Sequence, residues 1–246
     1  ISLSIFDYRF ESVMGRGIFI TGTDTGVGKT YFTCALAALL RSDGYLVGVM
    51  KPAETGCEVK DGQLFADDAW RLKEVSGCAE PMERICPYRL PEPLAPSIAA
   101  ERSGAKIDVD HLLAVCRDIG AKHDITLVEG AGGLMVPLVG RYTYADFARV
   151  ARLPVIVVAA NKLGVINHLL LTLEHGSCLG LPMLGYLLNH VDAESSLAAE
   201  TNREVLAGMT GVPCLGEIQF AKDTKTAENI LGEVDLQPVE LLLRNR

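Results

Sequence analysis

The 246-residue sequence lacks several features that would indicate other classes of protein. Basic residues are few: 23 Lys and Arg stand against 31 Asp and Glu, giving a net charge of −8. This balance argues against a broad nucleic-acid surface, because phosphate backbones are bound by clustered cations. No apolar run reaches the roughly 18 residues of a membrane span, and the first residues lack the pattern of a signal peptide. We therefore expect a soluble protein with no nucleic-acid or membrane partner.

The seven cysteines are scattered along the chain, odd in number and never spaced as CxxC. This spacing favours neither a disulfide framework nor a thiolate metal site. A reducing cytoplasm is the expected setting.

Short segments that are apolar throughout alternate with segments of helical pattern. Such strands are typical of a parallel sheet covered on both faces, so the sequence predicts a doubly wound α/β fold with a mostly parallel sheet flanked by helices. The proline-rich stretch 81–96 is predicted as a long loop, and long loops in compact domains are often functional. The predicted strands are 17–21, 46–51, 125–129, 155–160, 183–189 and 214–218, and the predicted helices are 29–41, 67–75, 109–120, 167–179 and 195–208.

The segment 18–30, IFITGTDTGVGKT, is a strand that enters a glycine-rich turn and then a helix. Gly22, Gly26 and Gly28 let the backbone turn tightly, and the helix that follows presents the positive end of its dipole to a phosphate. Lys29 supplies a charge to the β and γ phosphates, and the Thr30 hydroxyl can ligate Mg²⁺. The segment therefore predicts a P-loop that binds ATP.

The P-loop departs from the usual pattern at Thr23, which stands where the first glycine is expected, while Gly22 lies one place earlier. A turn that binds nothing fits less well, because Gly-Lys-Thr falls between a strand and a helix as the mechanism requires. Residues 1–13 precede Met14 and have no clear period. We expect 1–13 to be an extension without function and 14–246 to form a single P-loop NTPase-type α/β domain.

Mg²⁺ needs further oxygen ligands. Glu129 ends a predicted strand at the carboxyl edge of the sheet, where ligands of open α/β sheets bind. Asp67 and Asp68 open a predicted helix, and we expect Asp68 to bind metal and Asp67 to cap the helix. Lys51 ends another strand at the same edge and can stabilise developing charge on phosphate, although an exposed lysine without a role fits its position equally well.

Two other patterns are weaker. Asn161-Lys162-Leu163-Gly164 is similar to the sequence by which GTPases read guanine, but Gly164 replaces the aspartate that would accept the guanine hydrogen bonds, so ATP is favoured. His168 lies near a helix start, where we expect a packing or hydrogen-bonding role rather than general-base catalysis.

Four segments together resemble the dethiobiotin synthetases, in the same order and at suitable spacing. They are GTDTGVGKT at 22–30, KPAETG at 51–56, EGAGG at 129–133 and KLGVINH at 162–168. The resemblance implies an ATP- and Mg²⁺-dependent ligase that converts 7,8-diaminononanoate and CO₂ into dethiobiotin, ADP and phosphate. The diamine would take up CO₂ as a carbamate, whose oxygen attacks the γ phosphate to form a carbamic-phosphoric anhydride. The second amine would then close the ring.

The resemblance also implies roles for the residues at matching positions. Catalysis is assigned to Lys29, Lys51 and Thr25, and Mg²⁺ to Thr30, Asp68 and Glu129. ATP would be bound by Asp24, Gly26, Val27, Gly28, Lys29, Thr30, Glu129 and Asn189, the last of which reads adenine. Substrate would be held by Thr55, Gly132 and Gly133, together with Gly164 and Asn167 from the partner subunit, which implies a homodimer.

The sequence departs from the family at two positions. Gly26 stands where some members have a glutamate near the substrate, which removes one candidate site residue without touching the phosphate cradle. Gln219 follows Ile218 where a proline is often found, so the adenine contacts there do not carry over.

Two other protein classes share the P-loop. Partition and site-selection ATPases usually carry an extra lysine where this chain has Asp24, and some end in a basic amphipathic helix, whereas Pro238 and Glu240 interrupt the tail here. Cobyrinic-acid-type amidotransferases need a glutaminase domain, for which the chain has no room.

Overall fold

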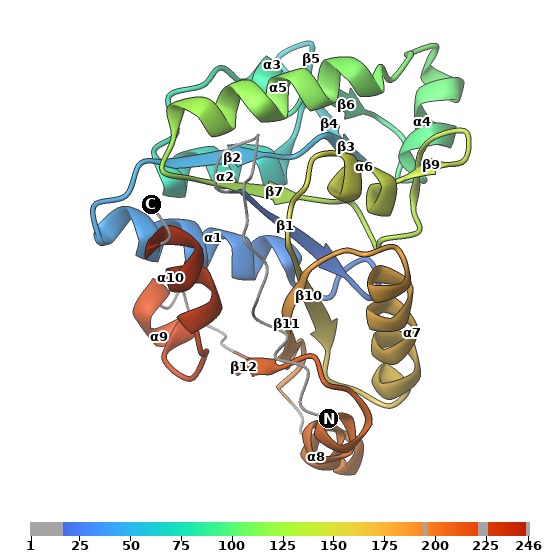
Figure 1. The fold of residues 1–246 in the computed structure, drawn as a ribbon. Helices are drawn as coiled ribbons and strands as arrows, with labels where there is room; N and C mark the ends of the chain where they lie inside the picture. The colour runs from blue at the N-terminus through green and yellow to red at the C-terminus, as the bar shows by residue number, and fades with distance from the viewer. Residues whose placement is uncertain (1–16, 194–195, 221–225, 245–246) are drawn as a thin grey trace.

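The computed structural model describes residues 17–193, 196–220 and 226–244, so the expected extension 1–13 lies outside the described residues. A sheet of six strands forms the centre of the molecule (Figure 1). Its strands are β1 (Gly17–Gly22), β2 (Val47–Met50), β7 (Ile125–Glu129), β10 (Val155–Ala160), β11 (Met183–Asn189) and β12 (Cys214–Ile218). Their order is β12-β11-β10-β1-β7-β2, and every neighbouring pair is parallel. The strand that leads into the P-loop is thus central.

Helices cover both faces of this sheet. Ile18 and Ile20 of β1 enter one apolar core, and Phe19 between them enters the other, because successive strand residues point to opposite faces. One core is closed by α1 (Lys29–Ser42), α2 (Asp67–Ser76), α9 (Ala227–Leu231) and α10 (Gln237–Arg244), and the other by α5 (Val109–Lys122), α6 (Tyr144–Val150), α7 (Val165–Cys178) and α8 (Leu197–Met209). The predicted doubly wound α/β fold is confirmed.

The predicted strands agree closely with the observed ones. The bounds of β7, β10, β11 and β12 are those expected, whereas β2 is one residue shorter at each end than the predicted 46–51. At its C-terminal end the chain leaves the sheet because the Lys51 amide donates to the carbonyl oxygen of Ile85, 2.7 Å away. Lys51 is therefore the first residue of the connection that follows β2, at the carboxyl edge of the sheet.

The proline-rich stretch 81–96 is more regular than predicted. It contains the short helix α3 (Met82–Ile85) and the strand β6 (Tyr88–Leu90), which pairs in parallel with β3 (Ala53–Thr55). Pro96 is the first residue of α4 (Pro96–Ser103), where its missing N–H is not needed. The prediction of a long loop is wrong for this segment, because pairing with β3 could not be seen in the local pattern.

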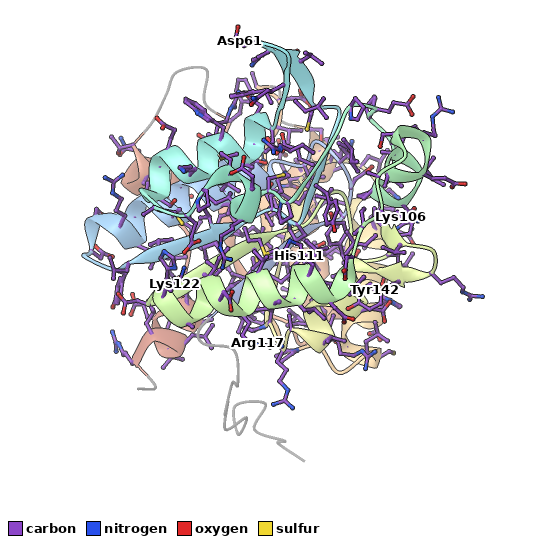
Figure 2. The ribbon with its side chains drawn as sticks, turned by 90° about the horizontal axis from the view of Figure 1, so that it is seen from above. Asp61, Lys106, His111, Arg117, Lys122 and Tyr142 are labelled. Carbon is purple, nitrogen blue, oxygen red and sulfur yellow. The ribbon has the colours of Figure 1, made fainter. Side chains whose placement is uncertain are left out.

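Two small hairpins extend from the main body. Asp61 and Gly62 form the turn of one of them with φ of 52° and 76°, the positive values that a two-residue turn requires. Asp61 lies at the outer tip of this hairpin (Figure 2). Their strands are β4 (Glu58–Lys60) with β5 (Gln63–Phe65), and β8 (Pro137–Val139) with β9 (Tyr142–Thr143). Within the described residues, none of the helices combines the length and apolar character needed to cross a membrane.

Candidate active site

The P-loop connects the end of β1 to the start of α1 and is hydrogen-bonded to β10, to β11 and to the loop that follows β7. The Gly22 amide donates to the Gly132 carbonyl at 3.2 Å, and the Thr23 amide donates to that of Val158 at 3.1 Å. The side-chain amide of Asn189 donates to the carbonyl oxygen of Val27 at 2.9 Å. The loop is therefore held in shape by contacts from outside itself.

Gly28 occupies the cap position immediately before α1, and its φ is 92°. A Cβ atom at this position would lie 2.0 Å from Nδ2 of Asn189, closer than two non-bonded atoms can approach. Both the backbone conformation and the space next to Asn189 therefore require glycine.

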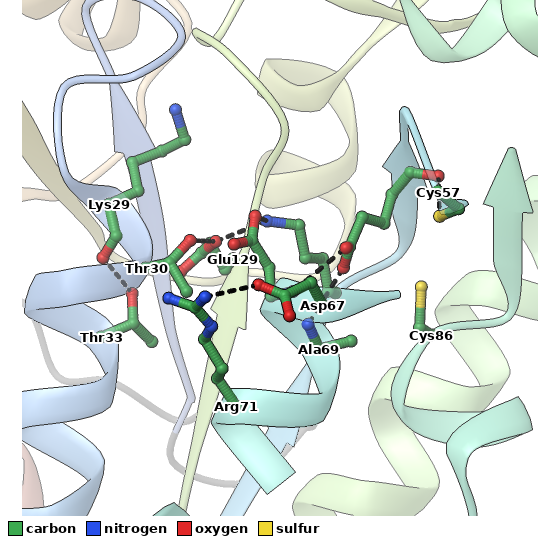
Figure 3. Close-up of polar contacts among 12 residues, drawn as sticks. Lys29, Thr30, Thr33, Cys57, Asp67, Ala69, Arg71, Cys86 and Glu129 are labelled. Carbon is green, nitrogen blue, oxygen red and sulfur yellow. Dashed lines mark hydrogen bonds and ion pairs between the residues drawn. The ribbon is translucent and has the colours of Figure 1, made fainter. Parts of the chain in front are cut away.

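Lys29 follows directly and is only 7% exposed. Its ammonium donates to the carbonyl oxygen of Asp24 at 2.9 Å, and its side chain rises away from the contact between Thr30 and Glu129 (Figure 3). Burial lowers the pKa of Lys29 to about 8, and the charge of Glu129 opposes this shift. A cation under such conditions would gain stability from a nearby phosphate.

A buried lysine and two carboxylates meet next to the P-loop, from the end of β2, the end of β7 and the first turn of α2. The Lys51 ammonium donates to Oε1 of Glu129 and to Oδ2 of Asp68, at 2.6 Å in both cases. The Thr30 hydroxyl donates to the same Oε1 at 2.7 Å (Figure 3). Burial alone would lower the pKa of Lys51, but the charges of Glu129 and Asp68 outweigh it and raise the pKa. Lys51 is therefore a buried, firmly charged group rather than an exposed lysine.

The helix α2, which carries Asp68, is not capped as predicted. Ala66 occupies the cap position, and Asp67 instead pairs with Arg71 at 2.8 Å on the surface (Figure 3). The free backbone amides at the helix start are bound by Glu54 of β3: Oε1 accepts from Asp68 at 3.0 Å and Oε2 from Ala69 at 2.9 Å. The prediction that Asp67 caps this helix is wrong, because the capping carboxylate comes from a distant strand.

A cavity of about 560 Å³, called the central cavity below, joins the P-loop to this charged group. Its apolar wall comes from the proline-rich stretch, which sequence reasoning marked as functional without identifying its residues. Tyr31 and Glu54 also line it and were missed, although Glu54 lies within the KPAETG segment. The lining residues include Thr25, Gly26, Gly28, Lys29, Thr30, Lys51, Glu54, Thr55, Asp68, Gly132 and the wall Pro93, Leu94, Ala95 and Pro96.

The remaining predicted site residues lie around the central cavity rather than on its surface. Glu129 is fully buried behind it, and Asn189 lies beneath the P-loop against Val27. Asp24 and Gly133 line a second cavity of about 440 Å³ on the other side of Thr25 and Gly132, next to α7. Gly164 and Asn167 are exposed at the start of α7, and so is His168. The structure therefore does not bring Gly164 and Asn167 into the central cavity of their own chain.

The oxygen atoms at the edge of the central cavity fit the requirements of Mg²⁺. Oε2 of Glu129 is buried and, among the described residues, has no hydrogen-bond partner, while Thr30 and Asp68 lie beside it. Mg²⁺ commonly takes only one or two carboxylates and completes its shell with waters and substrate phosphates. No group of three or more His, Cys, Asp and Glu side chains in the described ranges is arranged to hold a metal. The site therefore suits an ion that arrives together with a nucleotide.

Comparison with known proteins gives consistent results at the sequence level. A family model described as an AAA domain matches residues 16–228. The ATP-dependent dethiobiotin synthetase of Anaeromyxobacter dehalogenans is 41% identical over 219 residues, which are 89% of this chain and 96% of that protein. The enzymes of the same name from Thermodesulfovibrio yellowstonii and Bacillus licheniformis are each 36% identical, covering 93% and 90% of this chain and 98% and 94% of theirs.

Solved structures with a similar fold are more distant in sequence. A putative plasmid partition protein of Borrelia burgdorferi bound to AMPPNP has a TM-score of 0.59 at 15% identity, covering 94% of this chain and 99% of that one. The cell division ATPase MinD of Pyrococcus furiosus has a TM-score of 0.53 at 18% identity, covering 94% and 97%. These similarities show the P-loop NTPase fold alone, because the sequences are too different to carry a function.

Proposed function

The chain belongs to the family of ATP-dependent dethiobiotin synthetases, ligases of biotin biosynthesis, and on this premise we propose how its residues carry out the reaction. The central cavity takes the phosphates of ATP at one end and 7,8-diaminononanoate, carboxylated by CO₂, at the other. The products are dethiobiotin, ADP and phosphate. One observation supports this proposal: the P-loop and the ion-paired Lys51 and Asp68 line a single cavity, and Glu129 is bound to Lys51 directly behind it.

Lys29 and the amides of the P-loop bind the β and γ phosphates. The Lys29 ammonium exchanges the Asp24 carbonyl for phosphate oxygens, which suit a buried cation better because they are charged. Thr25 and Gly28 line the same end of the cavity. Asp24, Gly26 and Val27 complete the loop that surrounds the phosphates.

Lys51 stabilises the charge that develops when the carbamate oxygen attacks the γ phosphate. Two carboxylates hold its ammonium in a fixed position, so little reorganisation is needed as the charge forms. The reaction splits the β–γ phosphate linkage and forms a carbamic-phosphoric anhydride. The second amine then attacks the carbamate carbon, and the C–O bond to phosphate breaks as the ring closes.

Thr30, Asp68 and Glu129 hold Mg²⁺ in this proposal. The ion neutralises the phosphate oxygens when it is bound with ATP. Support comes from Oε2 of Glu129, which is buried without a hydrogen-bond partner among the described residues. Asn189 reads adenine with its amide oxygen, because its Nδ2 atom is already bound to Val27.

The substrate side of the site needs a second subunit. Thr55 and Gly132 line the central cavity and Gly133 the adjoining one, whereas Gly164 and Asn167 are exposed at the start of α7 and line neither cavity. Leu163 and Leu171, four residues before and after Asn167, are 87% and 62% exposed, as expected of residues that a partner would cover. We propose a homodimer in which each chain supplies this helix start to its partner's substrate. We also propose that the protein works in the reducing cytoplasm and that residues 14–246 form a single domain.

The test is dethiobiotin formation, followed by mass spectrometry, together with phosphate release from ATP and Mg²⁺ in the presence of bicarbonate. Lys29→Ala and Lys51→Ala should abolish turnover, and Lys29→Ala should also weaken ATP binding. Lys122→Ala is the matched control, because this lysine ends α5, pairs with Glu80 and does not line the central cavity. Phosphate release that does not depend on the diamine, without dethiobiotin, would identify a switch ATPase instead.

A further inference from the structure

We infer that Glu54 is a positioning residue: by binding the backbone amides of Asp68 and Ala69, it holds the start of α2 so that Asp68 contacts Lys51 and would be available to bind Mg²⁺. The inference rests on the proposed function, because it takes Asp68 as a metal ligand. It assigns a role to a carboxylate that the reaction itself does not use.

The contacts of Glu54 are those of a helix cap supplied from outside the helix. The first amides of a helix have no partner within it and need an acceptor. Ala66, at the cap position, has no side-chain oxygen, and each oxygen of Glu54 accepts one amide, at 3.0 Å from Asp68 and 2.9 Å from Ala69. The carboxylate also lies at the positive end of the helix dipole, which favours a negative charge.

The burial of Glu54 makes this contact more rigid than a surface cap. Glu54 is 7% exposed and lies on β3, three residues after Lys51. The segment that carries Lys51 therefore also carries the acceptor that fixes α2. The side chain of Asp68, by contrast, is 39% exposed and pairs with Lys51 at 2.6 Å.

The contacts of Glu54 should affect how tightly the site binds its metal ion. Lys51 binds the side chains of Asp68 and Glu129, and Glu54 binds the backbone amide of Asp68. Without Glu54 the helix start loses two hydrogen bonds, and Asp68 is no longer held at a fixed distance from Thr30 and Glu129. Groups that orient metal ligands typically change metal affinity by about 10- to 100-fold when removed.

The experiment compares Glu54→Gln and Glu54→Ala with the wild-type protein. Gln has the same shape but only one acceptor oxygen, so it keeps one of the two contacts. Mn²⁺ binding in the presence of ADP, followed by the loss of the free-ion EPR signal, measures the metal site without turnover. We expect Mn²⁺ affinity to fall about tenfold in Glu54→Ala and by less in Glu54→Gln, with a parallel rise in the Mg²⁺ concentration that gives half-maximal activity.

A second variant separates positioning from a direct chemical role. Ala66→Ser places a hydroxyl at the cap position, where it can accept from the amide of Asp68 or Ala69. In Glu54→Ala the space left by the carboxylate accommodates this oxygen. The double variant Glu54→Ala/Ala66→Ser should recover most of the Mn²⁺ affinity, although no carboxylate has been returned to the cavity.

The matched control is Asp108→Ala, which removes a capping carboxylate from α5, where Oδ1 of Asp108 accepts from the amide of His111. It should lower the melting temperature without changing Mn²⁺ affinity. Unchanged Mn²⁺ affinity in Glu54→Ala would overturn the inference. An effect confined to a higher KM for the diamine would also overturn it, because it would mean that Glu54 contacts the substrate. Failure of the wild-type protein to make dethiobiotin would refute the proposed function alone, because the Mn²⁺ measurements stand without it.

Discussion

Lys51→Met tests whether the buried charges beneath the P-loop depend on one another. The variant removes the cation next to Glu129, which is fully buried, and leaves its carboxylate with the Thr30 hydroxyl as its side-chain donor. Breaking a buried ion pair by removing one partner costs about 3–5 kcal/mol, because the remaining charge is uncompensated. For a chain of this length each kcal/mol lowers the melting temperature by roughly 2–4 °C. We therefore expect a decrease of about 6 °C or more.

The assay is a double-mutant cycle in urea with Lys51→Met, Glu129→Gln and the double variant. Glu129→Gln removes the buried negative charge while Lys51 keeps its bond to Asp68, so it should be less harmful. The double variant has neither buried charge, and we expect it to be more stable than Lys51→Met by about 1–3 kcal/mol. If the changes in unfolding free energy of the two single variants add without coupling, the buried pair does not exist as described. The same follows if Lys51→Met unfolds at the same urea concentration as the wild-type protein.

Three further predictions concern the nucleotide and the subunit contact. Burial lowers the pKa of Lys29 to about 8, and phosphate favours its charged form. The affinity for ATP should therefore be constant below pH 8 and fall above it, by up to about tenfold per pH unit. Calorimetric titrations that give one affinity from pH 7 to 9.5 would contradict this. Gly28→Ala should abolish ATP binding while the protein stays folded, since its Cβ would lie 2.0 Å from Asn189 Nδ2, and equilibrium dialysis with labelled ATP measures the loss. Leu171→Asp should give a monomer without ligase activity, and light scattering that still shows a dimer would remove Leu171 from the interface.

The sheet could be predicted closely from the sequence, because strands buried on both faces are apolar throughout. The segments 125–129 and 155–160 have the predicted bounds for this reason. The stretch 81–96 was harder, because β6 is only three residues long and exists through its pairing with β3. Pro238, expected to interrupt the tail, lies in the first turn of α10, where a proline is tolerated.

Candidate site residues could be named from the sequence, but their burial and the contacts between them could not. Motif spacing indicated Lys29, Thr30 and Glu129 as neighbours of the phosphates. In the structure Lys29 and Thr30 line the central cavity, and Glu129 is bound to Thr30 behind it. The burial of Lys51 could not be read from its position, which fits an exposed lysine equally well. The Glu54 cap was missed for a similar reason: its partners lie 14 and 15 residues further along, and local patterns reveal only caps within a turn of the helix start.

The hydrogen bonds that hold the P-loop also determine whether its backbone becomes ordered on folding or on ATP binding. Gly22 is bound to the loop that follows β7, and Thr23 and Val27 are bound to residues of β10 and β11, through contacts that involve no nucleotide. Ordering the backbone of a residue costs roughly 1–2 kcal/mol in conformational entropy, and here that loss occurs when the protein folds rather than when ATP arrives. The empty cradle and the filled one should thus have nearly the same shape, and ATP capture needs no preceding rearrangement of the loop.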